Sequence, residues 1–393
     1  MGELQGPALR IALVISSFDA GGAERVASIL CNRWARAGHA VTVLVWSPPS
    51  KPTHYPLDPS IDYIPLDLAR NSTGPFDVAR QNFRRLWRLR AALRRADPAI
   101  VVSFMVEQNV LAILAARSLR IPVVASERVH PGAHAIGRMR DAARRLTYPL
   151  ADAIVVQTSD IADWFAARMN IRAVVLPNPL EPASFSSARR PDKNPFDPRL
   201  IVAVGRLEWQ KGYDVLIAAF ARVAARFTDW RLDIFGSGAL EQDLRRRIAQ
   251  AGLESRITLR GVVNDIPSIL QSADVFVQAS RYEGFSNTIV EALASGCCVI
   301  ATDSPGATAE ILQAGVYGTL VAPDDVDGLA AAMATFMADA ARRESCARRA
   351  PAAVARYDAG AIAARWLDLL AGIAAASPGA EIRPAANDRA TAK

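Results

Sequence analysis

Two cations in the second half of the chain have the types and the spacing to bind a phosphorylated ligand. Arg206 and Lys211 lie in one segment, G-R-L-E-W-Q-K-G, whose glycines would let a ligand approach the backbone closely. A planar guanidinium beside an ammonium point charge suits a diphosphate. Such a pair alone is more often two ordinary surface cations, but only four of the 46 basic residues are lysines, so a lysine here is unusually informative.

Two carboxylates follow in a second segment. Glu283 and Glu291 are eight residues apart in E-G-F-S-N-T-I-V-E. A helix is expected to begin near Ser286 or Asn287, which places Glu283 in the preceding loop and Glu291 about one turn inside the helix. One acid could then meet a sugar and the other a ribose, while the helix N-terminus faces a phosphate. For either acid alone, a solvated loop acid or a complement to the helix dipole is the simpler interpretation.

The segments that must position these residues alternate between strand and helix patterns. Alternation of this kind predicts an α/β fold with doubly wound parallel sheets, here as two tandem Rossmann-like domains, and ligands bind such sheets beyond the carboxyl ends of the strands. A bare G-x-G turn, Gly236-Ser237-Gly238, follows one of these strands and is weak evidence by itself. The expected strands are 10–15, 41–46, 100–103, 122–125, 153–157 and 173–176, then 200–204, 231–235, 257–260, 275–278, 298–302 and 319–321; the helices of the first half are 23–37, 78–95, 107–118 and 137–148.

A proline-rich stretch without periodicity, residues 181–199, marks the domain boundary. We therefore expect an N-terminal domain over 1–185 and a C-terminal domain over 186–358. A last helix over 359–376 is expected to pack back on the N-terminal domain, and 377–393 is expected to be a disordered tail.

Composition excludes several classes of protein. With 51% hydrophobic and 22% charged residues in 393, the chain is neither disordered nor fibrous. No apolar run approaches the ~18 residues of a membrane span, and the run 11–15 is too short for a signal peptide, so we expect an unexported protein. The four cysteines show no zinc-like spacing, which favours a reducing compartment and no bound metal.

Positive charge is concentrated in the N-terminal half. Residues 1–190 contain 24 basic and 15 acidic residues, whereas the rest contain 22 and 24. The helix expected at 78–95 has seven arginines, no acid and an apolar stripe of Phe83, Leu86, Trp87 and Leu93, and 138–145 repeats the tendency. Peripheral contact with an anionic membrane and a core-packed helix with a solvated arginine face are equally favoured. No nucleic-acid motif accompanies the charge, so a nucleic-acid partner is not expected.

Five motifs stand out along the chain: E-G-F-S-N-T-I-V-E-A-L-A-S-G, G-R-L-E-W-Q-K-G, S-R-Y-E-G-F, the Gly21-Gly22-Ala23-Glu24-Arg25 turn and P-N-P at 177–179. Together they resemble the retaining glycosyltransferases of the GT4 family, which have the two-domain GT-B architecture with a cleft between the domains. The resemblance spans about residues 10–375. It implies retaining transfer of a hexose or N-acetylhexosamine from a nucleotide-sugar, expected to be UDP-linked, to a glycan or lipid-linked acceptor, without a metal or other cofactor. The C-terminal domain would bind this donor and the N-terminal domain would bind the acceptor.

The resemblance also implies roles for individual residues. Arg206 and Lys211 would hold the donor diphosphate and offset its charge as it leaves, Glu283 would contact the donor sugar, and Glu291 would accept hydrogen bonds from the ribose; Arg206, Lys211 and Glu283 are the catalytic candidates. The remaining donor-side candidates are Gly21, Gly22, Gly236, Gly238, Val263, Gly284, Phe285, Ser286, Asn287 and Thr288. Asp325-Val326-Asp327 has the D-x-D spacing of metal-dependent transferases, but its position favours ordinary carboxylates at a helix start.

The sequence departs from the family pattern after the strand that ends near Ala125. Many relatives have a histidine there, whereas this chain reads Ser126-Glu127-Arg128-Val129-His130-Pro131. Arg128 occupies that position, with His130 and His134 nearby, although a surface-loop histidine is the simpler interpretation of each. The acceptor-side candidates are Arg25, Glu127, Arg128 and His130. The S-E-R-x-x-P form resembles a subgroup that transfers N-acetylhexosamines in polysaccharide or lipid-linked oligosaccharide assembly.

Two alternatives remain open. One is another GT-B enzyme, such as a nucleotide-sugar epimerase, and the other is a non-catalytic protein that binds a nucleotide-sugar or another anion. For the transferase, the expected location is the cytoplasm or the inner face of the plasma membrane.

Overall fold

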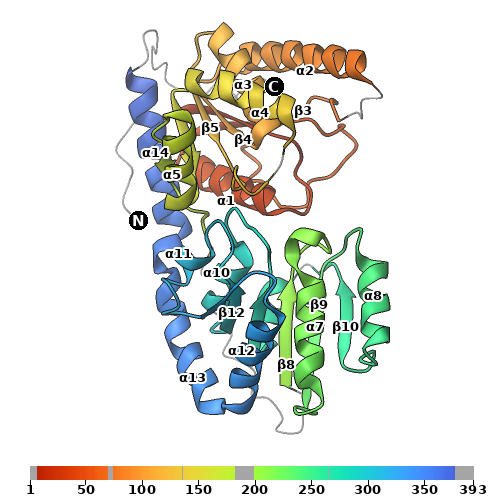
Figure 1. Ribbon diagram of the computed structural model, residues 1–393. Coiled ribbons are helices and arrows are strands. Elements are labelled where there is room, and N and C mark those ends of the chain that lie inside the picture. The colour runs from red at the N-terminus through yellow and green to blue at the C-terminus, as the bar shows by residue number, and fades with distance from the viewer. Residues whose placement is uncertain (1–6, 70–73, 135, 182–198, 264, 377–393) are drawn as a thin grey trace, which may run out of the picture. The chain divides into compact units, whose positions relative to one another are not determined.

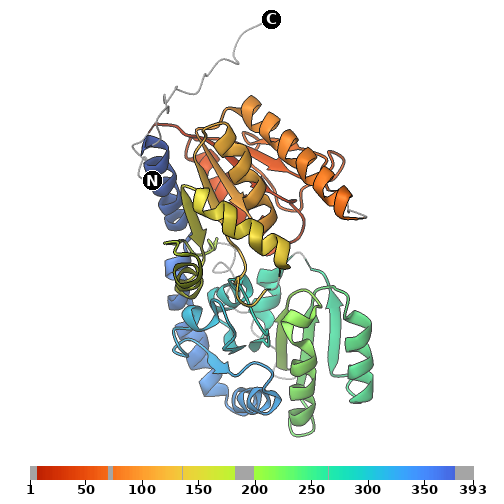
Figure 2. The same ribbon diagram turned by 45° about the horizontal axis from the view of Figure 1, so that its top comes forward.

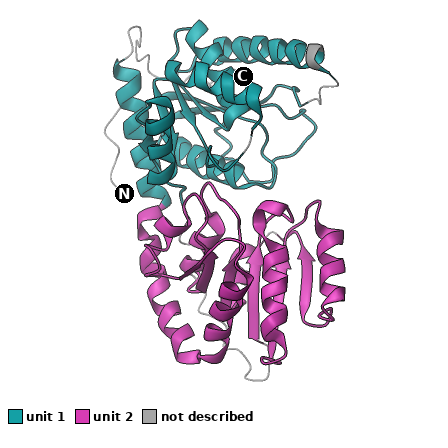
Figure 3. Ribbon diagram, viewed as in Figure 1, with its two compact units in different colours: residues 1–179, 359–393 teal, residues 180–358 magenta. Residues whose placement is uncertain are grey.

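The computed structural model describes residues 7–69, 74–134, 136–181, 199–263 and 265–376 (Figure 1). The chain divides into two compact units, residues 1–179 with 359–393 and residues 180–358 (Figure 3). The boundary expected between 185 and 186 and the tail 377–393 lie outside the described residues.

Unit 1 is built on a parallel seven-stranded sheet in the order β3-β2-β1-β4-β5-β6-β7. The order reverses between β1 and β4, where doubly wound sheets open a crevice for ligands. The strands are β1 (Arg10–Ile15), β2 (Ala40–Val45), β3 (Asp62–Pro65), β4 (Ile100–Phe104), β5 (Val123–Ser126), β6 (Ala153–Val156) and β7 (Val174–Val175).

Helices cover both faces of this sheet. One core contains α1 (Gly22–Arg36) and α14 (Ala359–Ala376), and the other contains α2 (Pro75–Ala96), α3 (Val106–Ser118) and α5 (Ser159–Met169). The helix α4 (Arg138–Thr147) packs beside α3 and continues into a single 3₁₀ turn, η1 (Tyr148–Leu150). In Figure 2, α2, α3 and α4 lie side by side, in orange to yellow.

The helix α14 packs on unit 1, where Trp366 meets Trp34 of α1 edge-on with ring centroids 6.1 Å apart. Its length and hydropathy would suffice for a membrane span, contrary to the expectation that no segment comes close. Seven of its residues, including Ile362, Trp366 and Leu370, are nevertheless buried in the protein. It is therefore placed as a core helix.

Unit 2 contains a parallel six-stranded sheet in the order β10-β9-β8-β11-β12-β13, with the reversal between β8 and β11. Its strands are β8 (Arg199–Val204), β9 (Trp230–Phe235), β10 (Ile257–Gly261), β11 (Val275–Gln278), β12 (Cys298–Thr302) and β13 (Thr319–Val321). Its helices are α7 (Tyr213–Ala224), α8 (Glu241–Gln250), α9 (Ile266–Ser272), α10 (Asn287–Ala294), α11 (Thr308–Ile311), α12 (Val326–Ala338) and α13 (Ala340–Arg349), with 3₁₀ segments η2 (Trp209–Lys211) and η3 (Ala350–Tyr357). The prediction of two doubly wound parallel sheets is confirmed.

One strand and one α-helix of unit 1 were not predicted. The strand β3 is short and polar and ends at a proline, which is typical of a sheet edge. The helix α5 does have sequence signals, because Thr158 caps its N-terminus by accepting a hydrogen bond from Ile161 N, and Asn170 ends it with φ of 53°.

Candidate active site

The carboxyl edge of the unit 2 sheet brings together two of the predicted catalytic residues. Lys211 Nζ donates to Glu283 Oε1 over 2.6 Å, although 72 residues separate them in sequence. The same carboxylate oxygen accepts a hydrogen bond from Ser280 Oγ over 2.7 Å. Both charged side chains are largely buried, so their ion pair is screened less than a surface pair. The result is an ammonium and a carboxylate fixed side by side at the end of the sheet.

Glycines allow the loops at this edge to touch one another. A Cβ on Gly236 would lie 1.9 Å from the carbonyl oxygen of Gly205, and one on Gly306 would lie 2.1 Å from that of Glu283. Gly236 and Gly306 also have φ of 138° and 121°, values that side chains rarely permit. A Cβ on Gly238 would lie 2.5 Å from Leu207 O. The G-x-G turn thus has a clear packing role, and contact of Gly236 and Gly238 with a donor stays a prediction.

Arg206 is placed differently from Lys211. Its Nη1 lies 3.1 Å from Glu208 Oε1, and its side chain is 66% exposed. The structure pairs Arg206 with this neighbouring acid and gives it no direct contact with the Lys211–Glu283 pair in the described part of the chain. An exposed arginine that pairs only with a surface acid can change its side-chain conformation. Binding of a donor diphosphate by Arg206 therefore stays a prediction.

The start of α10 follows the expected pattern. Ser286 is its N-cap, where Oγ accepts a hydrogen bond from Ile289 N and donates one to Gln278 Oε1. Thr288 Oγ1 also donates to Gln278, over 3.4 Å. Asn287 and Thr288 are partly exposed at the first turn, where helix N–H groups favour anions, while Gly284 before them is buried. Ser286 therefore already has internal partners, whereas Asn287 and Thr288 are more accessible.

Three other donor-side candidates are buried to different degrees. Glu291 lies inside α10 and is buried, so it is not a solvated acid. The Phe285 ring meets Tyr357 edge-on at 5.4 Å, which anchors the loop before α10. Val263 lies after β10 and packs partly buried against the core that contains Phe276. Their contacts with sugar, ribose and base stay predictions.

Sequence reasoning assigned no role to Ser280, Tyr213 or Arg281. Ser280 is buried and donates a hydrogen bond to the Glu283 carboxylate. Burial and the nearby charge of Glu283 raise the pKa of Tyr213, so the Tyr213 hydroxyl stays protonated. Arg281 donates to Asp214 and Asp324 over 2.8 Å each, and its guanidinium lies 4.6 Å from the centre of the Trp209 ring. These contacts fix the Lys211 and Glu283 loops against each other. Arg281 belongs to the S-R-Y-E-G-F motif, and this motif was the sequence feature that could have identified it as a site residue.

The D-x-D triplet has a structural role. Asp325 caps α12 by accepting a hydrogen bond from Gly328 N over 2.8 Å, and Asp327 pairs with Arg222. Within the described ranges, no three His, Cys, Asp or Glu side chains come together as a set of metal ligands.

Unit 1 contains a buried polar network at the acceptor-side motif. Glu127 Oε2 accepts a hydrogen bond from Tyr148 OH over 2.9 Å and lies 3.8 Å from Arg144 Nη1. Asn109 Nδ2 donates to the same Tyr148 oxygen. Burial raises the pKa of Glu127 to about 7, against the opposing effects of Arg144, Tyr148 and Arg128. Glu127 can therefore exchange a proton near neutral pH, which suits acid–base chemistry on a hydroxyl.

Arg128 joins three motifs that are far apart in sequence. Its Nη2 donates to Asn178 Oδ1 of the P-N-P segment over 2.8 Å, and its guanidinium lies 4.3 Å from the centre of the Phe104 ring. Burial lowers the pKa of Arg128 to about 9, and the charges of Glu24 and Glu127 oppose this shift. Glu24 belongs to the G-G-A-E-R turn, so the buried cation is flanked by acids from two motifs.

The other acceptor-side candidates are held in local contacts. His130 Nε2 lies 3.2 Å from Asp160 Oδ2, while its Nδ1 accepts a hydrogen bond from Gly132 N, so neutral His130 carries its proton on Nε2. Burial lowers the pKa of His130, and Asp160 acts in the opposite direction. Gly21 and Gly22 begin α1, and Arg25 N donates to Gly21 O within this first turn. Their contact with donor or acceptor stays a prediction.

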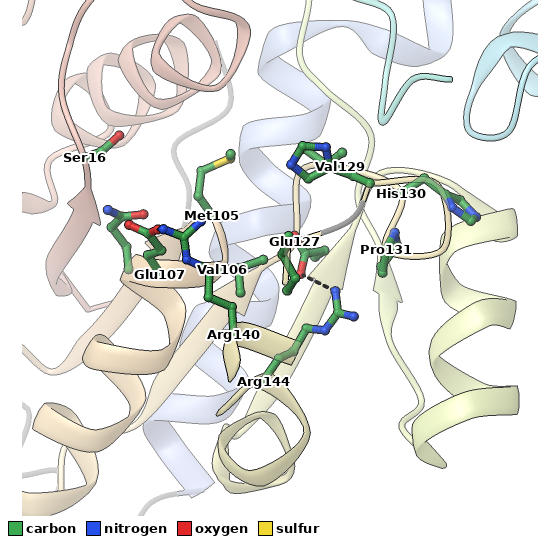
Figure 4. A pocket seen from close by; sticks show the side chains of 13 residues that line it. Ser16, Met105, Val106, Glu107, Glu127, Val129, His130, Pro131, Arg140 and Arg144 are labelled. Atoms are coloured by element: carbon green, nitrogen blue, oxygen red, sulfur yellow. Dashed lines mark ion pairs between the residues drawn. The ribbon is translucent and has the colours of Figure 1, made fainter. Parts of the chain in front are cut away.

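A cavity of about 240 Å³ opens beside Glu127 in unit 1 (Figure 4). Pockets for drug-sized ligands are usually about 300–1,000 Å³, so this one suits a single sugar ring. Figure 4 shows Glu127 between the loop of Val129 to Pro131 and the two α4 arginines. The lining includes Met105, Glu107, Glu127, His134, Arg140 and Arg144.

Both units match known glycosyltransferase family models. Residues 185–353 match the family described as glycosyl transferases group 1, and residues 21–179 match the glycosyl transferase 4-like domain.

Individual relatives agree with these families. One is a GalNAc-α-(1→4)-GalNAc-α-(1→3)-diNAcBac-PP-undecaprenol α-1,4-N-acetyl-D-galactosaminyltransferase of Campylobacter jejuni, 24% identical over 92% of this chain and 98% of that protein. A phosphatidyl-myo-inositol mannosyltransferase of Mycolicibacterium smegmatis is 35% identical over 60% of this chain and 62% of its own length. Sucrose-phosphate synthase from Thermosynechococcus elongatus has a similar fold, with a TM-score of 0.83 at 20% identity over 93% of this chain and 99% of that one. The chain described here therefore belongs to the GT4 family of glycosyltransferases, with the GT-B fold.

Proposed function

We propose that this enzyme transfers a hexose or N-acetylhexosamine, with retention of anomeric configuration, from a UDP-linked sugar to a lipid-linked or glycan acceptor in the assembly of a cell-surface glycan. Unit 2 would bind the donor and unit 1 the acceptor. The observation that carries the proposal is the Lys211–Glu283 pair at the carboxyl edge of the unit 2 sheet.

The pair suits the two ends of a sugar diphosphate. Glu283 Oε1 accepts hydrogen bonds from both Lys211 and Ser280. A diphosphate placed at the start of α10 would share the Lys211 ammonium with Glu283, leaving carboxylate lone pairs free to accept hydrogen bonds from sugar hydroxyls. One buried cation thus links recognition of the sugar to recognition of the phosphate.

Leaving-group stabilisation is the main chemical task of this arrangement. As the bond between the anomeric carbon and the phosphate oxygen breaks, negative charge grows on the nucleotide diphosphate. Lys211, a reoriented Arg206 and the first-turn N–H groups of α10 would face that charge without requiring a metal ion. By analogy with oxyanion holes, loss of one such donor costs about 10²- to 10³-fold in turnover. The acceptor hydroxyl would then attack the anomeric carbon from the face that the diphosphate leaves, form the new glycosidic bond and pass its proton to the departing phosphate oxygen, which retains the configuration.

The proposed acceptor site is the cavity beside Glu127. Its size suits a terminal sugar. Two arginines of α4 line it, Arg140 paired with Glu107 at 2.5 Å and Arg144 paired with Asp141 at 2.5 Å, and they would have to share these contacts with an anionic group next to that sugar. The Campylobacter relative is named for an undecaprenol-diphosphate-linked acceptor and the Mycolicibacterium relative for phosphatidyl-myo-inositol. These names support a lipid-linked acceptor. Such an acceptor would require a peripheral position at a membrane, for which we propose the inner face of the plasma membrane.

The test is nucleotide release from a panel of UDP-, GDP- and ADP-sugars in the presence of EDTA. We compare wild type with Lys211→Ala, Glu283→Gln and, as a matched control, Arg199→Met. Arg199 lies at the opposite end of β8 and pairs with the buried Asp274 at 3.6 Å. Arg199→Met therefore also removes the contact of a cation with a buried acid in unit 2, but away from the proposed site.

The proposal predicts release from one UDP-sugar that both site variants lose and the control keeps. Conversion of the donor to its epimer without transfer would instead support the epimerase. Release that survives in Lys211→Ala and Glu283→Gln would contradict the assignment of the site. NMR of the product must show the anomeric configuration of the donor.

A further inference from the structure

Two cysteine thiols meet where α13 packs against β12 in unit 2 (Figure 1). Cys298 opens β12, and its Sγ donates to the carbonyl oxygen of Arg343 in α13 over 3.0 Å. Cys346 stands three residues after Arg343 on the same helix, and a helical side chain points back over the preceding turn. The Cys346 sulfur therefore lies over the turn that Cys298 contacts, and the two side chains hydrogen-bond to each other.

The two thiols differ in their access to solvent. Cys346 is half-buried, whereas Cys298 is buried beneath it, as are Cys31 and Cys297. Cys297 precedes Cys298 directly, but its Sγ donates to Leu270 O over 2.7 Å on the other face of the sheet. A small reagent from solvent can thus reach Cys346 first, and the thiol behind Cys346 is that of Cys298.

The surroundings of Cys346 favour the thiolate, which is the reactive form of a cysteine. Arg349 Nη2 lies 3.9 Å from Cys346 Sγ, and Arg342 adds a second positive charge. The hydrogen bond from Cys298 lowers the pKa of Cys346 most, and the two arginines add to this effect against burial, which gives a pKa of about 6. A reachable thiolate beside a second thiol is the arrangement of a redox-sensitive cysteine with its resolving partner.

We propose that Cys298 and Cys346 are a redox pair that closes reversibly to a disulfide when the protein meets a peroxide. Sulfur atoms that share a hydrogen bond are close enough to join after side-chain rotation and a small backbone shift. In a reducing compartment such a disulfide is transient, and the dithiol is the resting form.

The chemistry balances with hydrogen peroxide as the oxidant. The Cys346 thiolate attacks one peroxide oxygen and becomes a sulfenic acid, while the other oxygen takes up a proton and leaves as water. The Cys298 sulfur then attacks the Cys346 sulfur, and the sulfenic hydroxyl leaves as a second water with the Cys298 proton. Two thiols lose two electrons to one peroxide, and a small dithiol returns these electrons by thiol–disulfide exchange.

Oxidation would fasten α13 covalently to the sheet of unit 2. The helix α13 continues into η3, after which the chain leaves unit 2 at Asp358. Cys298 begins β12, so the pair lies at the amino edge of the sheet, whereas Lys211 and Glu283 lie at the carboxyl edge. This inference therefore goes beyond the proposed function and does not depend on it.

The experiment is reaction of the native full-length protein with 5,5′-dithiobis(2-nitrobenzoate) at about pH 7, followed by intact mass spectrometry. Cys346 should attack the reagent and release one nitrothiobenzoate, and Cys298 should then displace the second from Cys346. We expect two nitrothiobenzoates per chain, no remaining adduct and a mass loss of about 2 Da. Hydrogen peroxide should give the same linked Cys298–Cys346 peptides, and dithiothreitol should separate them.

Three variants assign the roles of the two thiols. Cys298→Ala should release one nitrothiobenzoate and keep the adduct, and Cys346→Ser should lose the rapid reaction. Cys297→Ser, the control at the neighbouring buried thiol, should behave as wild type. The pair would be refuted by a stable adduct on wild type, by two releases from Cys298→Ala, by the absence of rapid reaction in wild type, or by a disulfide that joins two chains.

Discussion

Glu127 makes the stability of unit 1 depend on pH in a way that one substitution can remove. Its pKa rises from an ordinary 4.5 to about 7 through burial, so the folded protein favours the protonated acid more than the unfolded chain does. The resulting stabilisation is complete below pH 4.5 and is lost as the pH rises through 7. In Glu127→Gln this position no longer titrates.

The magnitude follows from the two pKa values. One pKa unit corresponds to ~1.4 kcal/mol, so between about pH 5 and pH 8 the wild type should lose roughly 2 to 3 kcal/mol relative to Glu127→Gln. The glutamine can still accept the Tyr148 hydrogen bond, and the attraction between the ionised carboxylate and Arg144 is already included in the pKa of about 7.

Urea unfolding at several pH values measures this difference. Tryptophan fluorescence is a suitable signal because Trp34 and Trp366 are buried in unit 1. The free energies of unfolding of the two proteins should move apart in favour of Glu127→Gln as the pH rises. A gap that is constant from pH 5 to pH 8 would refute the assignment of a raised pKa to Glu127.

Three further substitutions test the packing and the charges of the two sites. Gly306→Ala should lower the free energy of unfolding by roughly 1–3 kcal/mol, because its Cβ would lie 2.1 Å from Glu283 O. Gly252 also has a positive φ but has open space around it, so Gly252→Ala should lower the free energy of unfolding less. Equal shifts in the melting temperatures of the two variants would count against close packing at Gly306. In a double-mutant cycle, the effects of Arg128→Met and Asn178→Ala on the free energy of unfolding should be non-additive by about 1.5–3 kcal/mol, because the two residues share a buried charged hydrogen bond of 2.8 Å. Additive effects would show that this hydrogen bond contributes nothing to stability. Arg206→Met should change stability by less than about 1 kcal/mol, since its pair with Glu208 is exposed, yet lower turnover about 100-fold or more; unchanged turnover would remove Arg206 from the proposed mechanism.

Much of the fold was predictable because parallel strands buried on both faces read as short apolar runs between glycine-rich turns. The same turns located the donor-side candidates, since the carboxyl ends of parallel strands meet at one edge. The Lys211–Glu283 contact agrees with that reasoning. The loop-fixing role of Arg281 did not emerge, because its partners Asp214 and Asp324 come from distant segments.

The faces of the arginine-rich helices were harder to infer. Periodicity identifies which residues share a side of a helix, but it does not say which side meets the core. In α4 the buried side contains Arg144, held by Asp141 and near Glu127, so hydrophobicity alone assigns the wrong face. The contact of Arg128 with Asn178 joins residues 50 positions apart and likewise depends on the assembled sheet.

The most direct test of the central claim is calorimetric titration of UDP and GDP into wild type, Lys211→Met and Arg199→Met. Our account places the nucleotide diphosphate beside Lys211 in unit 2, so wild type and Arg199→Met should bind UDP with the same Kd. Lys211→Met should bind it at least about tenfold more weakly, since a charge-assisted contact to phosphate is lost. If Lys211→Met binds UDP as tightly as wild type, the donor site does not lie at the carboxyl edge of this sheet and the proposed mechanism is wrong.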